Sequence, residues 1–259
     1  YRSDKANLFR NLDRTSGQRR DDDVPVFGVV NADDPNAYYI THATRRPVFS
    51  YSVGNSDATM FASDVRANIQ GTSCLIHWRR EARRVHIPLP GAFNVENAMA
   101  ALLTVATLLD RNPLDIADGL ESLRNMPGRM HTVRNDLPYI PIVDYAHTPG
   151  AFEKILPMLQ AYTENRLFVV FGAAGERDRE KRQMLGKIAA THADVIVLAD
   201  EDPRGEKPLA ILEEVAEGCR TARPNIQNGT DLFVIPPRRD AIAHTLAMAK
   251  SGDTLLLLA

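Results

Sequence analysis

The second half of the chain alternates short apolar runs with amphipathic segments, and this pattern restricts its fold more than any other feature. The apolar runs are predicted strands: Ile140–Val143, Leu167–Phe171, Val195–Leu198, Leu232–Ile235 and Thr254–Leu258. The segments between them carry apolar residues at helical spacing. They are predicted helices over residues 150–161, 180–191, 209–220 and 240–250. Strands that alternate with helices indicate a parallel sheet covered on both faces.

The first half has a different pattern. Residues 48–89 alternate apolar and polar positions over short distances, which is typical of strands, and they include a predicted β-hairpin whose charged turn is Arg79–Arg84. Residues 15–23 (TSGQRRDDD) are predicted to form an exposed loop. The other predicted elements are a helix over residues 1–12, a strand over Val26–Val30, and helices over Asn94–Leu109 and Pro113–Leu123.

Met126–Arg129 (MPGR) marks the change between the two patterns. Proline and glycine together break a helix, so this segment is the predicted joint between two domains. The predicted domains are residues 1–125 and 126–259. A chain of 259 residues is long enough for two domains of ordinary size.

Charge and composition exclude several classes of protein. A net charge of −2 gives no general attraction for nucleic acid or acidic membranes. The basic Arg79–Arg84 turn could suggest nucleic acid, but no aromatic platform is evident beside it, and a solvated hairpin turn is the favoured interpretation. The longest apolar run, Ala98–Leu109, is too short for a membrane span. Two unpaired cysteines, Cys74 and Cys219, and no signal peptide favour the cytoplasm.

The residues that follow the strands are the first place to seek a site, because ligands of open α/β sheets bind at the carboxyl ends of the strands. Gly172–Gly175 could place free N–H groups at a helix start for a phosphate or carboxylate, or could serve tight packing. Arg177 and Arg204 could grip carboxylates, or could form a solvated set with nearby acids. Asp144 and His147 could be an acid–base pair, a ribose contact or a loop hydrogen bond.

Seven segments in order resemble motifs of the Mur ligase family, and they cover nearly the whole chain. The segments are Tyr1–Phe9 (YRSDKANLF), Asn31–Asp34 (NADD), Gly91–Ala98 (GAFNVENA), Met126–Met130 (MPGRM), Asp144–Pro149 (DYAHTP), Phe171–Arg182 (FGAAGERDREKR) and Ala199–Glu206 (ADEDPRGE). Within the family the chain is most similar to the MurE type, the UDP-N-acetylmuramoyl-dipeptide:diamino-acid ligases. The implied fold is part of the central ATPase domain, a mixed sheet with helices, followed by a Rossmann-like C-terminal domain.

The resemblance implies an ADP-forming ligase of peptidoglycan synthesis with ATP and Mg²⁺ as cofactors. ATP phosphorylates the D-glutamyl carboxylate of a UDP-linked muramoyl dipeptide, and the amine of a diamino acid attacks the acyl phosphate. Catalysis then rests on positioning and charge neutralisation. The implied partners are these two substrates, without nucleic acid and without membrane insertion.

The resemblance also implies roles for individual residues. Lys5 carries a carbamate that binds Mg²⁺, and partial burial would favour the neutral amine that carbamylation needs. The nucleotide is bound by Asn94, Asn97, Arg129, Asp144 and His147, of which His147 is also catalytic. The incoming diamino acid is bound by Arg177, Asp202, Pro203, Arg204 and Glu206.

Some residues depart from the family pattern. The phosphate-binding loop GxxxxGK[ST] and the later GKGHE segment do not occur, so both chain ends are interpreted as cuts and the chain alone is expected not to turn over ATP. Asp202 replaces the asparagine of diaminopimelate-selective members, and a carboxylate there would repel a substrate carboxylate. Asp202, together with Ala174 and Glu176, leaves open the alternative that the protein is a Mur-like ligase that joins a different amine to a different carboxylate. A non-catalytic nucleotide-binding or scaffold module is the other alternative.

Overall fold

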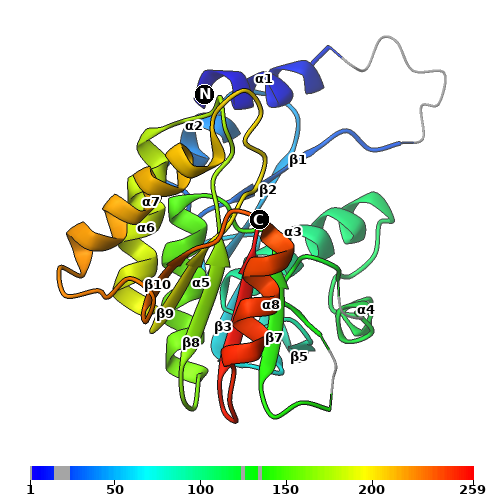
Figure 1. Ribbon diagram of the computed structural model, residues 1–259. Coiled ribbons are helices and arrows are strands. Elements are labelled where there is room, and N and C mark those ends of the chain that lie inside the picture. Colours follow the sequence, from blue (N-terminus) through cyan, green and yellow to red (C-terminus); the bar gives the residue numbers. More distant parts are fainter. Residues whose placement is uncertain (1, 15–23, 124–125, 134–135) are drawn as a thin grey trace. The chain divides into compact units, whose positions relative to one another are not determined.

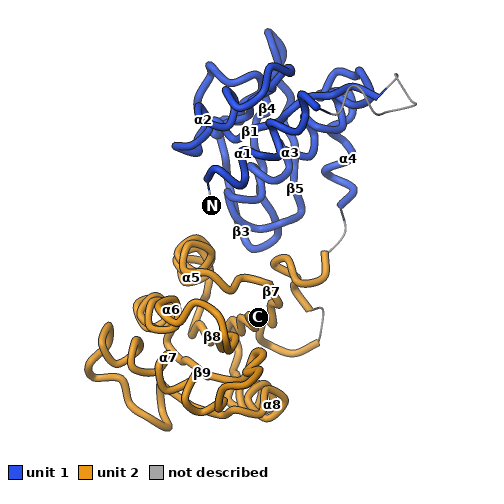
Figure 2. The backbone as a smooth tube through the Cα atoms, turned by 90° about the horizontal axis from the view of Figure 1, so that it is seen from above, with its two compact units in different colours: residues 1–124 blue, residues 125–259 orange. Residues whose placement is uncertain are grey.

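The computed structural model describes residues 2–14, 24–123, 126–133 and 136–259. The chain divides into two compact units, residues 1–124 and 125–259 (Figure 2). The predicted boundary after residue 125 is one residue from this division. The predicted loop at residues 15–23 lies outside the described residues.

The first unit contains a five-stranded mixed sheet in the order β1-β2-β3-β4-β5. The first three strands are parallel, and β3, β4 and β5 are antiparallel neighbours. The strands are β1 (Gly28–Asn31), β2 (Val48–Val53), β3 (Met60–Asn68), β4 (Gly71–Trp78) and β5 (Glu81–Ile87).

Helix α3 (Phe93–Leu108) covers one face of this sheet. Its buried side chains recur every three or four residues, as the apolar stripe of a helix requires, and they include Val95, Met99 and Leu103. They join one core with Met60 and Ile76 of the sheet. The other helices of the unit are α1 (Arg2–Leu12), α2 (Ala37–Thr41) and α4 (Asp118–Glu121).

The second unit contains a six-stranded sheet in the order β10-β9-β8-β11-β7-β6. All pairs are parallel except β6 with β7. The last strand in sequence, β11, lies between β8 and β7. Strands β8 and β9 pair directly and in parallel, so their carboxyl ends are neighbours. The strands are β6 (His131–Thr132), β7 (Ile140–Asp144), β8 (Leu167–Phe171), β9 (Val195–Leu198), β10 (Leu232–Val234) and β11 (Thr254–Leu258).

Helices cover both faces of this sheet. Strands β8 and β9 are buried along their whole length, as a parallel sheet between two helical layers requires. On one face Phe171 packs edge-on against Phe152 of α5, and on the other Phe168 shares a core with Ala241 of α8. Figure 1 shows α8 in front of the strands, with α6 and α7 to their left. The helices are α5 (Pro149–Tyr162), α6 (Glu180–His192), α7 (Pro208–Ala222) and α8 (Arg238–Met248).

The predicted fold class is confirmed, and two local predictions are wrong. The predicted charged turn is only Arg79–Arg80, because Trp78 pairs with Glu81 and the next arginines belong to β5. The predicted helix over residues 113–123 is reduced to α4. The Asn112 side chain accepts the Leu114 N–H at 3.0 Å, and such a local bond competes with helix formation.

Residues Met126–Ala259 are expected to fold without the first half of the chain. The sheet of this unit has six strands in the described part of the chain, and both of its faces are covered by helices of the same unit. Thermal unfolding of this segment, followed by circular dichroism, should show a single cooperative transition. A gradual loss of signal without a transition would contradict the prediction.

Candidate active site

Two neighbouring turns at the carboxyl edge of the second sheet interlock through their backbones. The turn after β8 contains Gly172 and Gly175, and the turn after β9 contains Ala199 and Pro203. A Cβ on Gly172 would lie 2.0 Å from the Ala199 carbonyl oxygen, and one on Gly175 would lie 2.0 Å from that of Pro203. Only glycine permits this approach. We call residues 172–177 and 199–206 together the platform.

The predicted anion site at Gly172–Gly175 is not at a helix start. Helix α6 begins at Glu180, after the turn has ended. The Gly175 N–H donates to the Asp202 carbonyl at 2.8 Å, so it is not free for a ligand. The interpretation that these small residues serve tight packing is the one that the structure supports.

A buried arginine of α6, Arg182, holds the two turns of the platform together. The Arg182 side chain is fully buried and makes ion pairs with Glu206 at 2.7 Å and Glu214 at 3.1 Å. It also donates to the Ala174 carbonyl at 3.3 Å. Glu206 accepts the Glu176 N–H at 2.6 Å. Hydrogen bonds from Arg182 and the Glu176 backbone lower the pKa of Glu206 to about 2, so Glu206 is ionised at neutral pH. The structure therefore gives Glu206 a supporting position in the platform.

The platform carries the two arginines that were predicted to bind substrate. Arg204 has a left-handed backbone, with φ of 50°. Its Nε donates to Asp202 at 3.3 Å, so Asp202 forms an ion pair with Arg204 on the exposed side of the turn. Pro203 lies between them with its carbonyl against Gly175. Among the described residues, Arg177 has no side-chain partner. The platform thus offers two guanidinium groups from neighbouring turns.

At the carboxyl end of β7, the side chains of Asp144 and His147 have different hydrogen-bond partners. The buried Asp144 carboxylate accepts the Met130 N–H at 2.7 Å and the Ala146 N–H at 2.8 Å. His147 Nδ1 lies 2.9 Å from the Tyr145 carbonyl oxygen. Of the three interpretations of this pair, the geometry supports a loop hydrogen bond for Asp144. The Arg129 guanidinium lies 5.4 Å from the centre of the exposed Tyr145 ring, which packs edge-on against His147.

Three charged residues at the same edge, Arg238, Asp200 and Glu201, were not among the predicted site residues. Arg238 donates to the carbonyls of Asp200 and Leu258. Burial lowers the pKa of Arg238, against the attraction of Glu201. Within the described structure, one oxygen each of Asp200 and Glu201 is buried without a hydrogen-bond partner, and burial raises the pKa of Asp200. Extending the rule for strand ends to β10 would have identified Arg238, which begins the next helix.

The two residues of the first unit that were predicted to contact adenine, Asn94 and Asn97, are hydrogen-bonded to each other. Buried Asn94 donates to the Pro90 carbonyl at 2.7 Å, and its side-chain oxygen accepts from Asn97 at 3.2 Å. Asn97 is exposed at the start of α3. At the end of β1, Asn31 donates to Glu96 of the same helix at 3.2 Å. The first turn of α3 is therefore held to the sheet while Asn97 remains accessible.

Lys5 lies on the exposed side of α1, so the burial that was expected to favour its neutral amine is not found. In the described parts of the chain, no three His, Cys, Asp or Glu residues are grouped as metal ligands. A Mg²⁺ ion bound mainly by nucleotide phosphates and water needs only one or two protein oxygens. Lys5 as the residue that would hold such an ion, through a carbamate, stays a prediction.

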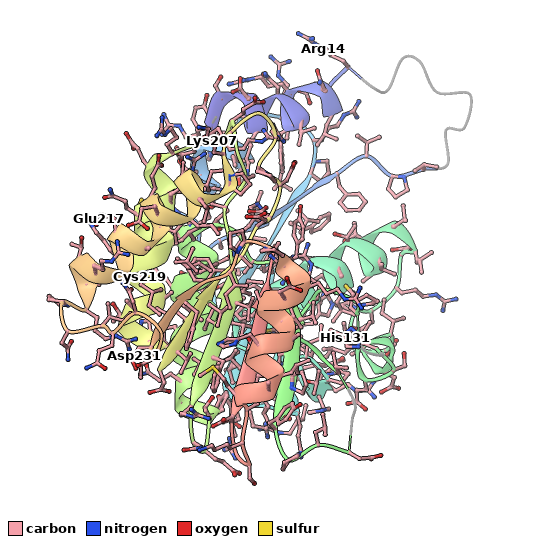
Figure 3. The ribbon with its side chains drawn as sticks, viewed as in Figure 1. Arg14, His131, Lys207, Glu217, Cys219 and Asp231 are labelled. Atoms are coloured by element: carbon pink, nitrogen blue, oxygen red, sulfur yellow. The ribbon has the colours of Figure 1, made fainter. Side chains whose placement is uncertain are left out.

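Both cysteines are buried free thiols. Burial raises the pKa of Cys74 to about 11 and that of Cys219, on α7 (Figure 3), to about 12. Neutral buried thiols are poor nucleophiles, so neither fits covalent catalysis. None of the described helices has the length and apolar character needed to span a membrane.

Two family models match the chain. The Mur ligase middle domain matches residues 1–105, and the Mur ligase, glutamate ligase domain matches residues 128–259. The chain belongs to the Mur ligase family. The second model covers the platform and the turn after β7, and the first covers Lys5 and the start of α3.

Named relatives agree with this assignment. A UDP-N-acetylmuramyl-tripeptide synthetase of Borrelia garinii subsp. bavariensis is 39% identical over 258 residues, which are 100% of this chain and 48% of the relative. A UDP-N-acetylmuramoyl-L-alanyl-D-glutamate--2,6-diaminopimelate ligase of Bacillus licheniformis is 35% identical over 257 residues, 99% of this chain and 50% of the relative. A solved ligase of the latter name has a TM-score of 0.58 and 28% identity, and the match covers 100% of this chain and 50% of that one. The chain spans about half the length of these relatives.

Proposed function

We propose that this chain is part of an ADP-forming MurE-type ligase that adds a diamino acid to UDP-N-acetylmuramoyl-L-alanyl-D-glutamate. The observation that carries the proposal is the platform, which presents Arg177 and Arg204 at the carboxyl edge of a glutamate ligase domain. Its location would be the cytoplasm, where buried free thiols remain reduced.

In the proposed reaction ATP transfers its γ-phosphoryl group to the D-glutamyl carboxylate. The amine of the diamino acid then attacks the acyl carbon and phosphate leaves, so that ADP, phosphate and an amide are formed. Asn97 and Arg129 would contact the nucleotide, and Asp144 and His147 would lie near its ribose. A Mg²⁺ ion held by the Lys5 carbamate would neutralise phosphate charge.

The chemistry of the platform favours meso-diaminopimelate. Two guanidinium groups suit an amino acid with a second, distal carboxylate, because they can bind carboxylates bidentately. Lysine has an ammonium group in place of the distal carboxylate, and the two arginines would repel it.

A ligase for a different amine is the second candidate, and Asp202 favours it. The Asp202 carboxylate occupies Arg204 Nε, so it competes with a substrate carboxylate for the same guanidinium. In the described structure Asp202 is the only ion-pair partner of Arg204, which leaves its two terminal nitrogens for a ligand. A non-catalytic scaffold is less well supported, because the relatives named above are synthetases and ligases.

Arg204→Ala in the full-length enzyme is expected to raise the KM for meso-diaminopimelate and to leave the KM for ATP nearly unchanged. Loss of one charge-assisted contact costs about 1.5–3 kcal/mol, or roughly 10- to 150-fold in affinity. Steady-state kinetics with each substrate varied in turn would measure both constants.

Arg220→Ala is the matched control, because Arg220 pairs with Glu213 and Glu217 on α7, outside the platform. It should change neither constant. If Arg204→Ala leaves diaminopimelate use intact, or if the unmodified enzyme prefers lysine, the diaminopimelate assignment fails and the different-amine ligase is favoured.

A further inference from the structure

The first unit contains a cavity of about 660 Å³ that the proposed ligase site does not use. It lies between β2, the turn that joins β4 to β5, and the carboxyl end of α3. Its walls include two aromatic side chains, Phe49 and Trp78, and Thr107 of α3. Its volume is within the range of small-molecule pockets, about 300–1,000 Å³.

Three arginines line this cavity, and the guanidinium groups of two of them have no partner among the described residues. Arg79 lies 5.6 Å above the centre of the Trp78 ring. Within the described parts of the chain, neither the Arg80 nor the Arg111 side chain has a hydrogen-bond or ion-pair partner. The other two arginines of the hairpin are engaged elsewhere: Arg83 binds Asp118 and the Leu114 carbonyl, and Arg84 binds Asp64.

Acidic groups at the cavity are fewer than basic ones. Glu81 and Asp110 line it, and Glu81 accepts a hydrogen bond from Asn112 at 3.2 Å. The cavity therefore has an excess of one positive charge beside aromatic walls. The aromatic side chains beside the basic hairpin turn are those of Trp78 and Phe49.

The backbone around the cavity is held in an unfavourable conformation at two places. Arg79 has φ of 55° and Asp110 has φ of 50°, in the left-handed region that residues other than glycine rarely adopt. Both residues are at chain reversals that require this conformation: Arg79 lies in the two-residue turn between β4 and β5, and Asp110 follows the C-cap of α3, where the Arg111 N–H donates to the Ala106 carbonyl at 2.9 Å. The two reversals bring the hairpin turn and the end of α3 to the same cavity.

We propose that this cavity binds a small anion that carries a flat aromatic ring, of the nucleoside monophosphate type. The ring would stack against Trp78 or Phe49, and the phosphate would bind Arg80 and Arg111. This site is separate from the predicted adenine contacts, because Asn94 and Thr107 are about 20 Å apart along α3. The inference is independent of the proposed ligase activity.

Trp78 is the single tryptophan of this chain and is therefore a local reporter. We expect titration with AMP, GMP or UMP to change Trp78 fluorescence saturably, with inorganic phosphate and uridine giving weaker responses. The double variant Arg80→Gln/Arg111→Gln should bind the nucleotides roughly tenfold or more weakly. Arg66→Gln is the matched control: Arg66 is an exposed arginine on β3 that is paired with Asp64, and its loss should leave binding unchanged.

Absence of a saturable change with all three nucleotides at millimolar concentration would overturn the proposal. Equal affinity in the double variant would also overturn it, because the arginines would then contribute nothing. A response to inorganic phosphate as strong as that to the nucleotides would overturn the role of the aromatic walls. Ligase activity can be present or absent in each case, so failure here is distinguishable from failure of the proposed function.

Discussion

Replacing Lys5 with alanine in the full-length enzyme is expected to lower the ligation rate about 100-fold or more, the scale for loss of one electrostatic contact in a transition state. A carbamate converts the lysine cation into an anionic oxygen ligand, and alanine cannot form it. Acetate or formate at high concentration should restore part of the activity, because either supplies a carboxylate in the space that the side chain leaves. An enzyme-coupled assay of ADP release would measure both the loss of rate in the variant and its partial restoration by acetate or formate.

The Lys5→Arg variant distinguishes a role of the carbamate from a role of the positive charge of lysine. Arginine retains the cation but cannot be carbamylated, so this variant should be as slow as Lys5→Ala. Leu8→Ala, at an exposed neighbour on α1, is the control for the helix itself and should retain full activity. An active Lys5→Arg enzyme would remove the carbamate from the mechanism.

Arg182→Met is expected to destabilise the second unit by about 3–5 kcal/mol, because loss of one partner from a buried ion pair leaves the other without compensation. The Arg182 side chain is fully buried between Glu206 and Glu214. Methionine is of similar length but cannot donate to either carboxylate. Urea unfolding followed by circular dichroism would measure the change in the free energy of unfolding.

The surface pair Arg220–Glu213 provides the comparison on the same unit. Arg220→Met should cost no more than about 1 kcal/mol, as exposed ion pairs do. A loss of less than about 1 kcal/mol in Arg182→Met would show that Arg182 does not fix the platform. In that case the position of Arg204 would depend on the backbone contacts of Gly172 and Gly175 alone.

The strands of the second unit were predictable because burial on both faces leaves almost no polar residue in them. The predicted bounds of Leu167–Phe171 and Val195–Leu198 are those of β8 and β9. The order of the strands was not predictable from such runs, because all of them are equally apolar. That β11 lies between β8 and β7 depends on contacts far apart in the sequence.

The candidate site was predictable as a set of turns but not as a set of contacts. Arg177 and Arg204 follow strands, and their motif places them at the carboxyl edge. That Glu206 binds Arg182 could not be read from spacing, because Arg182 lies within a helix that also contains exposed charges. The same limit hid the unpartnered oxygens of Asp200 and Glu201, since both residues occur in a turn rich in acids.

The most direct test of the proposed function is ligation by the full-length protein with ATP, UDP-N-acetylmuramoyl-L-alanyl-D-glutamate and a panel of amino acids, followed by ADP release and by the mass of the product. ADP should form only when the UDP-linked acceptor and a diamino acid are both present, with meso-diaminopimelate preferred over lysine. The product mass should increase by that of one diamino acid less one water. Absence of an amide product with every amino acid of the panel, while the enzyme is folded and binds ATP, would contradict the proposed function.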